Sequence, residues 1–144
     1  MIDNYCFTSI KIGDKYDAEY VNKLYNMVRL QSDVPFFCFT DNTDGLNKNI
    51  ETIDMDVTEY QDWYRWWPAW CKILMFNHLH EFDRKIFFDL DVIIFRNIDN
   101  LFTYNPDKFC IIRDFNRHIR QDWKKMNSSV NAAPGVKCGT QTLV

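Results

Sequence analysis

The sequence predicts an α/β fold: a mostly parallel, Rossmann-like sheet with helices on both faces. Two observations support this prediction. Short β-prone runs alternate with segments of helical periodicity, and the connections between them are short. Ligands of such sheets bind beyond the carboxyl ends of the strands. The acids Asp41, Asp89 and Asp91 all fall at such ends.

The first half of the chain shows three elements in order. Residues 5–10 are β-prone, and Gly13 follows them as a breaker. From residue 17 to 31 the apolar side chains recur on one helical face, with Asp17 in the N-cap position. Residues 35–40 are almost wholly apolar and predict a buried strand, which a dense turn signal closes.

The second half continues the alternation. Pro68 fits the first turn of a helix that runs to about residue 81. The other expected elements are short strands at 50–53, 86–88 and 109–113, a short helix at 98–102 and a strand that begins at 127–130.

Composition limits the classes of function. A chain of 144 residues, 47% hydrophobic and 26% charged, is long enough for one core. A net charge of −3 gives no electrostatic footprint for nucleic acid, and no apolar run approaches the roughly 20 residues of a membrane span. The five cysteines lack Cys-x-x-Cys spacing, and the first residues do not form a signal peptide. We therefore expect reduced cysteines in a cytoplasmic protein.

Asp89 and Asp91 lie within residues 87–95, the most apolar stretch of the chain. In a strand, a period of two points both carboxylates to one face and Leu90 to the other. Neighbouring carboxylates are costly to bury unpaired, whereas a Mg²⁺-type ion with phosphate co-ligands removes that cost. The alternative is a strand end whose acids reach solvent. The apolar flanks favour a binding site.

Residues 87–92 (FFDLDV), followed by residues 97–102 (NIDNLF), resemble the Asp-X-Asp block of GT-A-fold glycosyltransferases, in particular glycogenin-like and related nucleotide-diphospho-sugar transferases. Lys72 matches a lysine in a helix one strand before that block. Residues 14–16 (DKY) match the end of the nucleotide loop after the first strand. The resemblance covers roughly residues 4–130.

The resemblance implies a transferase that moves a sugar from a nucleoside-diphosphate donor, a UDP-sugar above all, to a carbohydrate or protein hydroxyl. Asp91 would bind Mn²⁺ or Mg²⁺ directly, and Asp89 would contact the metal, the ribose or both. Lys72 would face the ribose or the diphosphate. The alternative for Lys72 is a solvated helix residue.

The resemblance also implies a nucleotide pocket lined by the backbone around Ile10 and Lys11, with Tyr16 stacked on the base and Asp41 near it. The alternatives are that Tyr16 only caps the helix start and that Asp41 is a turn residue, favoured there for backbone reasons. Asp114, just past a strand, is a candidate general base for an inverting enzyme, against a plain turn residue. Whether the sugar configuration is retained or inverted stays open.

Residues 63–70 contain four of the five tryptophans. Aromatic faces suit sugar rings and bases, and the alternative is that this segment packs on the sheet.

The expected organisation is a nucleotide-sugar-binding domain over residues 1–130 and an atypical, poorly packed tail over residues 131–144, which has no aromatic or acidic residue. Fold relatives continue with an acceptor-site segment, so one alternative is a non-catalytic or hydrolysis-only nucleotide-sugar-binding fragment. Another is a haloacid-dehalogenase-type phosphatase with Asp89 as its nucleophile. A sugar-nucleotide pyrophosphorylase is disfavoured because the first strand is not followed by a Gly-rich basic loop.

Overall fold

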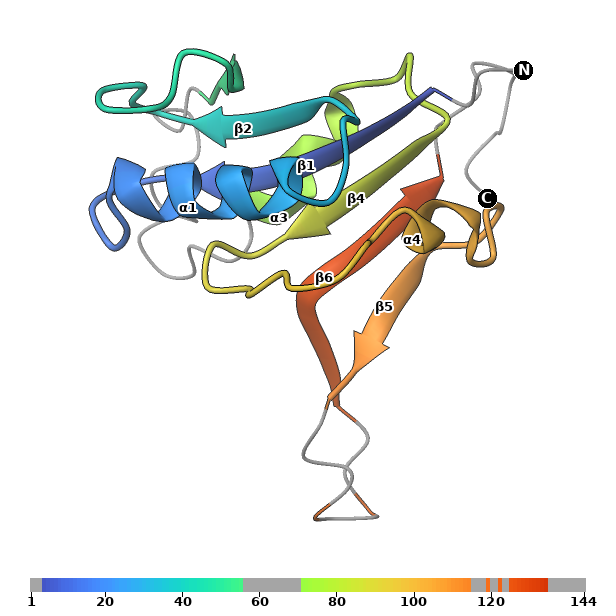
Figure 1. Cartoon of the computed structure of the whole chain (residues 1–144). Coiled ribbons are helices and arrows are strands. Elements are labelled where there is room, and N and C mark those ends of the chain that lie inside the picture. The colour runs from blue at the N-terminus through green and yellow to red at the C-terminus, as the bar shows by residue number, and fades with distance from the viewer. Residues whose placement is uncertain (1–3, 56–70, 115–118, 120–121, 123–124, 135–144) are drawn as a thin grey trace.

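The computed structural model describes residues 4–55, 71–114, 119, 122 and 125–134, which contain a six-stranded sheet (Figure 1). The strand order is β3-β2-β1-β4-β6-β5. The first four strands in this order pair in parallel, and β6 pairs antiparallel with both β4 and β5. The strands are β1 Tyr5–Lys11, β2 Phe36–Thr40, β3 Glu51–Asp54, β4 Arg84–Phe88, β5 Cys110–Arg113 and β6 Met126–Pro134. The mostly parallel α/β sheet and all the expected strands are confirmed.

Helix α1 spans Ala18–Arg29 and confirms the helix expected over residues 17–31. The side chain of Asp17, the N-cap residue, accepts a hydrogen bond from the amide of Glu19 at 3.0 Å. The buried residues of α1 recur at spacings of three and four, which places them on one face. They are Val21, Leu24, Tyr25 and Val28.

The other described helices are short: α3 Cys71–Leu74, a 3₁₀ turn Met75–Asn77, and α4 Asn100–Thr103. The prediction of a helix that reaches residue 81 is wrong at its C-terminal end. Leu79 has a φ of 58°, a left-handed conformation that interrupts a helix. The chain turns there, and Leu79 and Phe82 both become buried. The expected helix start at Pro68 and the tryptophans of residues 63–70 lie outside the described residues.

Apolar side chains cover both faces of the sheet, as expected for buried strands. One face packs against α1 and α4, and its core includes Phe7, Phe88, Leu24 and Phe102. The opposite face packs against α3 and the 3₁₀ turn, and its core includes Phe39, Phe87 and Met75. In Figure 1, α1 lies in front of the sheet and α3 behind it.

Arg84 fixes the connection between α4 and β5. Its side chain is only 1% exposed. It donates hydrogen bonds to four backbone carbonyls, at 3.3, 2.7, 3.1 and 2.5 Å. These carbonyls belong to Leu101, Tyr104, Asn105 and Pro106. A guanidinium has enough N–H donors to bond all four carbonyls. These hydrogen bonds compensate the burial of its charge at the start of β4.

Strand β6 runs past residue 130, the expected domain boundary, to Pro134. Residues Asn131, Ala132 and Ala133 are buried, because they pair with β4 in the interior of the sheet. Residues 135–144 lie outside the described residues, and for them the predicted tail stays a prediction.

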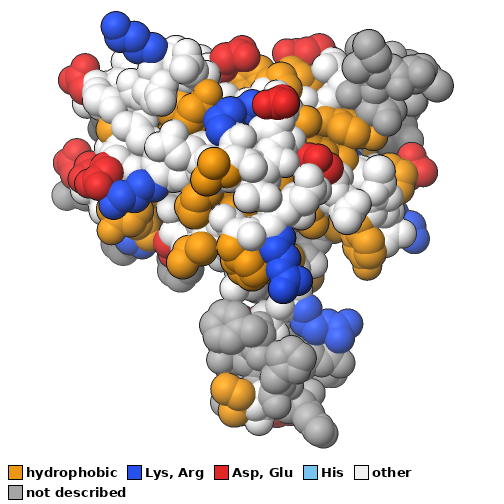
Figure 2. Space-filling model, viewed as in Figure 1, with side chains coloured by type: hydrophobic (Ala, Val, Ile, Leu, Met, Phe, Trp, Pro, Cys, Tyr) orange, Lys and Arg blue, Asp and Glu red, His pale blue; other side chains and the backbone are white. Residues whose placement is uncertain are grey.

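The described cysteines Cys6, Cys38, Cys71 and Cys110 are all free thiols, and the first three are buried. Acidic and basic side chains are interspersed with apolar ones over the face that Figure 2 shows. None of the helices in the described part of the chain could cross a membrane.

Candidate functional site

The two acids of the Asp-X-Asp segment lie in a turn, directly after the last residue of β4, Phe88. The carbonyl of Asp89 accepts a hydrogen bond from the amide of Val92 at 3.1 Å, and the amide of Asp89 donates to the carbonyl of Ser129 at 2.8 Å. The expectation that Asp89 and Asp91 lie in a continuing strand is therefore wrong. The chain leaves the sheet at Asp89, so the period of two does not apply to Asp91. Asp91 is exposed, and the Asp89 side chain is 27% exposed.

Lys72 meets Asp89 at this turn. Its Nζ lies 2.6 Å from Asp89 Oδ1 and donates a hydrogen bond to Ser128 Oγ at 3.2 Å. The same ammonium lies 5.0 Å from the centre of the Phe87 ring, a cation–π contact. With 19% of its side chain exposed, Lys72 is not the solvated helix residue of the alternative interpretation.

Asp41 joins the end of β2 to the loop after β1. Its Oδ2 accepts a hydrogen bond from the amide of Gly13 at 3.0 Å. Burial first, and the charge of Asp41 second, raise the pKa of the Cys71 thiol at the start of α3, the helix that carries Lys72. The hydrogen bond from Gly13 to Asp41 brings the carboxyl ends of β1 and β2 together.

Ile10 and Lys11 end β1 with their side chains on opposite faces of the sheet. Ile10 packs against the core on the α3 face, the face on which Lys72 lies over Phe87. Lys11 is only 8% exposed. Because its side chain shares the α1 face with that of Phe7, only its backbone is available to a ligand beside Lys72.

Tyr16 is partly buried against the core on the α1 face. Its ring packs edge-on against Tyr20, with centroids 4.8 Å apart, and the Lys15 ammonium lies 5.0 Å from the ring centre. The helix cap is Asp17 rather than Tyr16. Base stacking by Tyr16 stays a prediction.

Asp114 follows β5 and is half-buried. Its neighbour Arg113 pairs with Met126, three residues before Ser129, the residue that binds the amide of Asp89. A register shift in the β5–β6 pairing separates these positions from the regular part of the ladder. A role for Asp114 as general base stays a prediction.

Ser128 and Ser129 belong to the site, although the sequence analysis predicts only a strand that begins at residues 127–130. The signal was present in the short polar run at residues 127–129. That run could be assigned to the site only with the knowledge that β6 lies next to β4, and the sequence does not specify this strand order.

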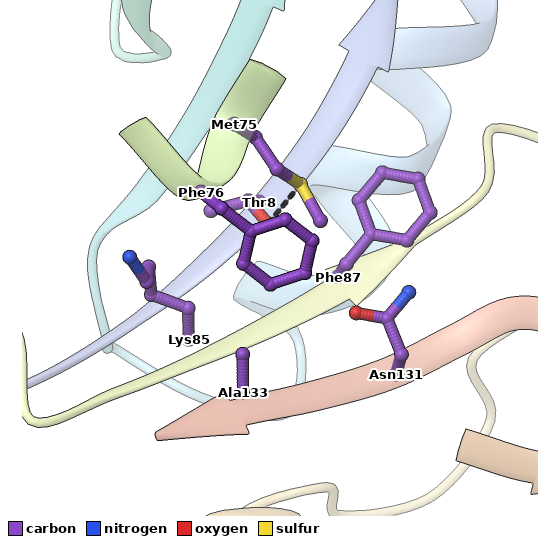
Figure 3. A pocket seen from close by; sticks show the side chains of 7 residues that line it. All are labelled: Thr8, Met75, Phe76, Lys85, Phe87, Asn131 and Ala133. Carbon is purple, nitrogen blue, oxygen red and sulfur yellow. Dashed lines mark hydrogen bonds between the residues drawn. The ribbon is translucent and has the colours of Figure 1, made fainter. Parts of the chain in front are cut away.

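A small cavity lies on the α3 face of the sheet, next to Phe87 (Figure 3). Its volume is about 10 Å³, and it is lined by Thr8, Met75, Phe76, Lys85, Phe87, Asn131 and Ala133. Lys85 donates a hydrogen bond to the carbonyl of His78 at 2.9 Å, and burial lowers its pKa. A cavity of this size holds about one water molecule, so the open end of the sheet is the better candidate for a nucleotide.

The acids at the end of β4 suit a hard divalent ion. In the described part of the chain, no group of three or more His, Cys, Asp and Glu side chains is placed to hold a metal. However, Asp89 already accepts a cation, the ammonium of Lys72. Two carboxylates fit a Mg²⁺-type ion that takes its other ligands from phosphates and water. They do not by themselves make an all-protein metal cage.

Comparisons with known proteins identify the fold. The sequence matches no family model and no curated protein. The structure is similar to the galactosyltransferase LgtC, solved in complex with donor and acceptor sugar analogues, with a TM-score of 0.66 and 13% identity over 90% of this chain and 57% of that chain. It is also similar to mouse xyloside xylosyltransferase 1 in its apo form, with a TM-score of 0.57 and 16% identity over 90% of this chain and 67% of that chain.

The chain therefore spans little more than half the length of the galactosyltransferase. Its sheet, with helices on both faces, has the fold of the GT-A-type glycosyltransferases.

Proposed function

We propose that this chain binds a nucleoside-diphosphate sugar, most of all a UDP-sugar, and acts in metal-dependent glycosyl transfer. The observation that supports this is the contact between Lys72 and Asp89, two residues before Asp91, at the carboxyl end of β4. A metal-bound diphosphate is held by carboxylates that bind the divalent ion and by a cation that binds a phosphate. The two acids and the ammonium of Lys72 are groups of these kinds. The fold that holds them is shared with glycosyltransferases.

In this proposal Asp91 and Asp89 hold Mn²⁺ or Mg²⁺, and Lys72 binds the diphosphate. The bound ion supplies charge neutralisation at the departing diphosphate. The reaction breaks the bond between the sugar carbon and the phosphate oxygen and joins that carbon to the acceptor oxygen. The acceptor proton passes to a base, for which Asp114 is our candidate.

In this proposal the remaining predicted residues surround the nucleotide. The backbone of Ile10 and Lys11 would line its pocket, and Tyr16 would stack on the base. For Asp41 we propose an indirect role, because its carboxylate is already bonded to the amide of Gly13. The acceptor would be a carbohydrate or protein hydroxyl.

Titration calorimetry with UDP tests the proposal. Binding is expected with Mn²⁺ or Mg²⁺, and it should be lost with EDTA or in the Asp91→Asn variant. Asp107→Asn is the matched control, since Asp107 is an exposed acid in the connection between α4 and β5. Equal UDP affinity with and without metal contradicts the proposal.

A second candidate is a nucleotide-sugar-binding chain that does not transfer the sugar. The observation in its favour is that the chain spans 57% of the length of the galactosyltransferase. Incubation with UDP-sugars and candidate acceptors separates the two: transfer gives a glycosylated acceptor, a hydrolytic chain releases free sugar, and a binding chain leaves the donor intact. The fold does not favour a haloacid-dehalogenase-type phosphatase, because the solved structures that it resembles are glycosyltransferases.

A further inference from the structure

The ammonium of Lys72 has three contacts at the end of β4. It lies 2.6 Å from Asp89 Oδ1, 3.2 Å from Ser128 Oγ and 5.0 Å from the centre of the Phe87 ring. An ammonium has three donors, and the contacts with Ser128 and Phe87 hold it beside the carboxylate of Asp89. Lys72 thus neutralises Asp89 within the protein itself.

This arrangement places two cations in competition. A divalent ion bound by Asp89 and Asp91 shares the carboxylate with Lys72, and two positive centres within a few ångströms repel each other. In the protein alone, an incoming ion must therefore overcome the positive charge of Lys72 or displace the ammonium from Asp89.

A diphosphate removes this conflict. Its oxygens are strong acceptors for an ammonium, and they also complete the coordination of a Mg²⁺-type ion. Once Lys72 has a phosphate oxygen as its partner, Asp89 is free for the metal. Each ligand thereby improves the site for the other, and such coupling is reciprocal.

On the basis of the proposed function, we infer that Lys72 is a built-in counter-cation of Asp89 that the divalent ion and the diphosphate displace together. Metal and nucleotide then bind synergistically: the metal alone binds weakly, and the diphosphate strengthens its binding. Lys72 is the residue that couples the two.

Mn²⁺ binding to the full chain, measured by electron paramagnetic resonance of the free ion, tests this inference. In the absence of nucleotide, Lys72→Met should bind Mn²⁺ about thirtyfold more tightly than the wild type, the factor that a unit charge about 4 Å from a divalent ion produces in water. UDP should strengthen Mn²⁺ binding in the wild type and do so less in the variant. Lys72→Arg keeps the positive charge and should remain close to the wild type in Mn²⁺ affinity.

Lys23→Met is the matched control. Lys23 also pairs with a carboxylate, that of Glu19 at 2.7 Å, but this pair lies on the exposed surface of α1. The control should leave Mn²⁺ binding unchanged. Lys72→Gln serves as a second neutral variant if Lys72→Met fails to fold, as judged by circular dichroism.

The outcomes distinguish the inference from the function on which it rests. If neutral variants at position 72 bind Mn²⁺ alone no more tightly than the wild type, the inference is wrong, while metal-dependent UDP binding by the wild type would still support the proposed function. If the wild type shows no metal-dependent UDP binding, both are wrong.

Discussion

The carboxylate of Asp41, one residue beyond β2, accepts a hydrogen bond from the amide of Gly13 in the loop after β1, at 3.0 Å. Gly13 has a φ of 67°, a left-handed conformation that a residue with a Cβ rarely adopts. The bond ties the expected nucleotide loop to the neighbouring strand. Asp41 therefore has a visible positioning role that does not require contact with a ligand.

The first prediction separates positioning by Asp41 from a direct role of its charge. Asp41→Asn keeps an acceptor oxygen for the Gly13 amide, so metal-dependent UDP affinity should stay near that of the wild type. Asp41→Ala removes the acceptor and should weaken affinity about three- to tenfold, the usual range for one lost hydrogen bond. Calorimetry on both variants measures this. Equal losses in the two variants would instead indicate that the charge acts directly.

The second prediction concerns Arg84. Removing the buried guanidinium in Arg84→Ala leaves four backbone carbonyls without this donor. We expect a loss of about 3–5 kcal/mol in the free energy of unfolding, as for a broken buried polar network. Urea denaturation monitored by fluorescence measures it. The control Arg96→Ala, at an exposed position, should change stability by no more than about 0.5 kcal/mol.

The third prediction is a loss of stability in alkali. Burial raises the pKa of Cys6 from 9.0 to about 12 and that of Cys38 from 9.0 to about 11. Between pH 9 and the raised pKa of each thiol, the unfolded thiol loses its proton while the folded one retains it. The free energy of unfolding therefore falls as pH rises above 9. At pH 10 the loss relative to pH 7 should be about 1 kcal/mol for each thiol.

Thermal unfolding between pH 7 and 10 measures this dependence. Cys6→Ala should reduce the slope of stability against pH, whatever its effect at neutral pH. Val130→Ala truncates a half-buried apolar side chain without removing a titrating group, and it should leave the slope unchanged. A slope that Cys6→Ala does not alter would refute the assignment.

The fourth prediction concerns β6. A chain that ends at Val130 loses the residues that pair with Arg84, Lys85, Ile86 and Phe87 of β4. The shortened chain also lacks the buried side chains Asn131, Ala132 and Ala133. It should therefore unfold at much lower urea concentrations than the wild type. A chain that ends at Pro134 keeps all the described strand pairs and serves as the comparison. Equal stability of the two shortened chains would show that the β4–β6 pairing contributes little.

Sequence patterns alone predicted the elements that depend on local chemistry. The alternation of apolar runs and helical periodicity indicated the α/β sheet, because a buried parallel strand is apolar on both faces. Asp17 was recognised as a helix cap, since a cap is a contact between residues two apart. The apolar run that ends at Phe88, directly before Asp89, likewise predicted the end of β4.

The tertiary structure decided how the site is assembled. It placed Asp89 and Asp91 in a turn, which the hydrogen bond from the amide of Val92 to the carbonyl of Asp89 closes. It ended the helix after Asn77, because the burial of Leu79 and Phe82 requires a turn there. It joined Lys72, Asp89 and Ser128, which are 17 to 56 positions apart, because β6 lies beside β4. Such contacts depend on which strands are neighbours, and local sequence patterns do not specify strand order.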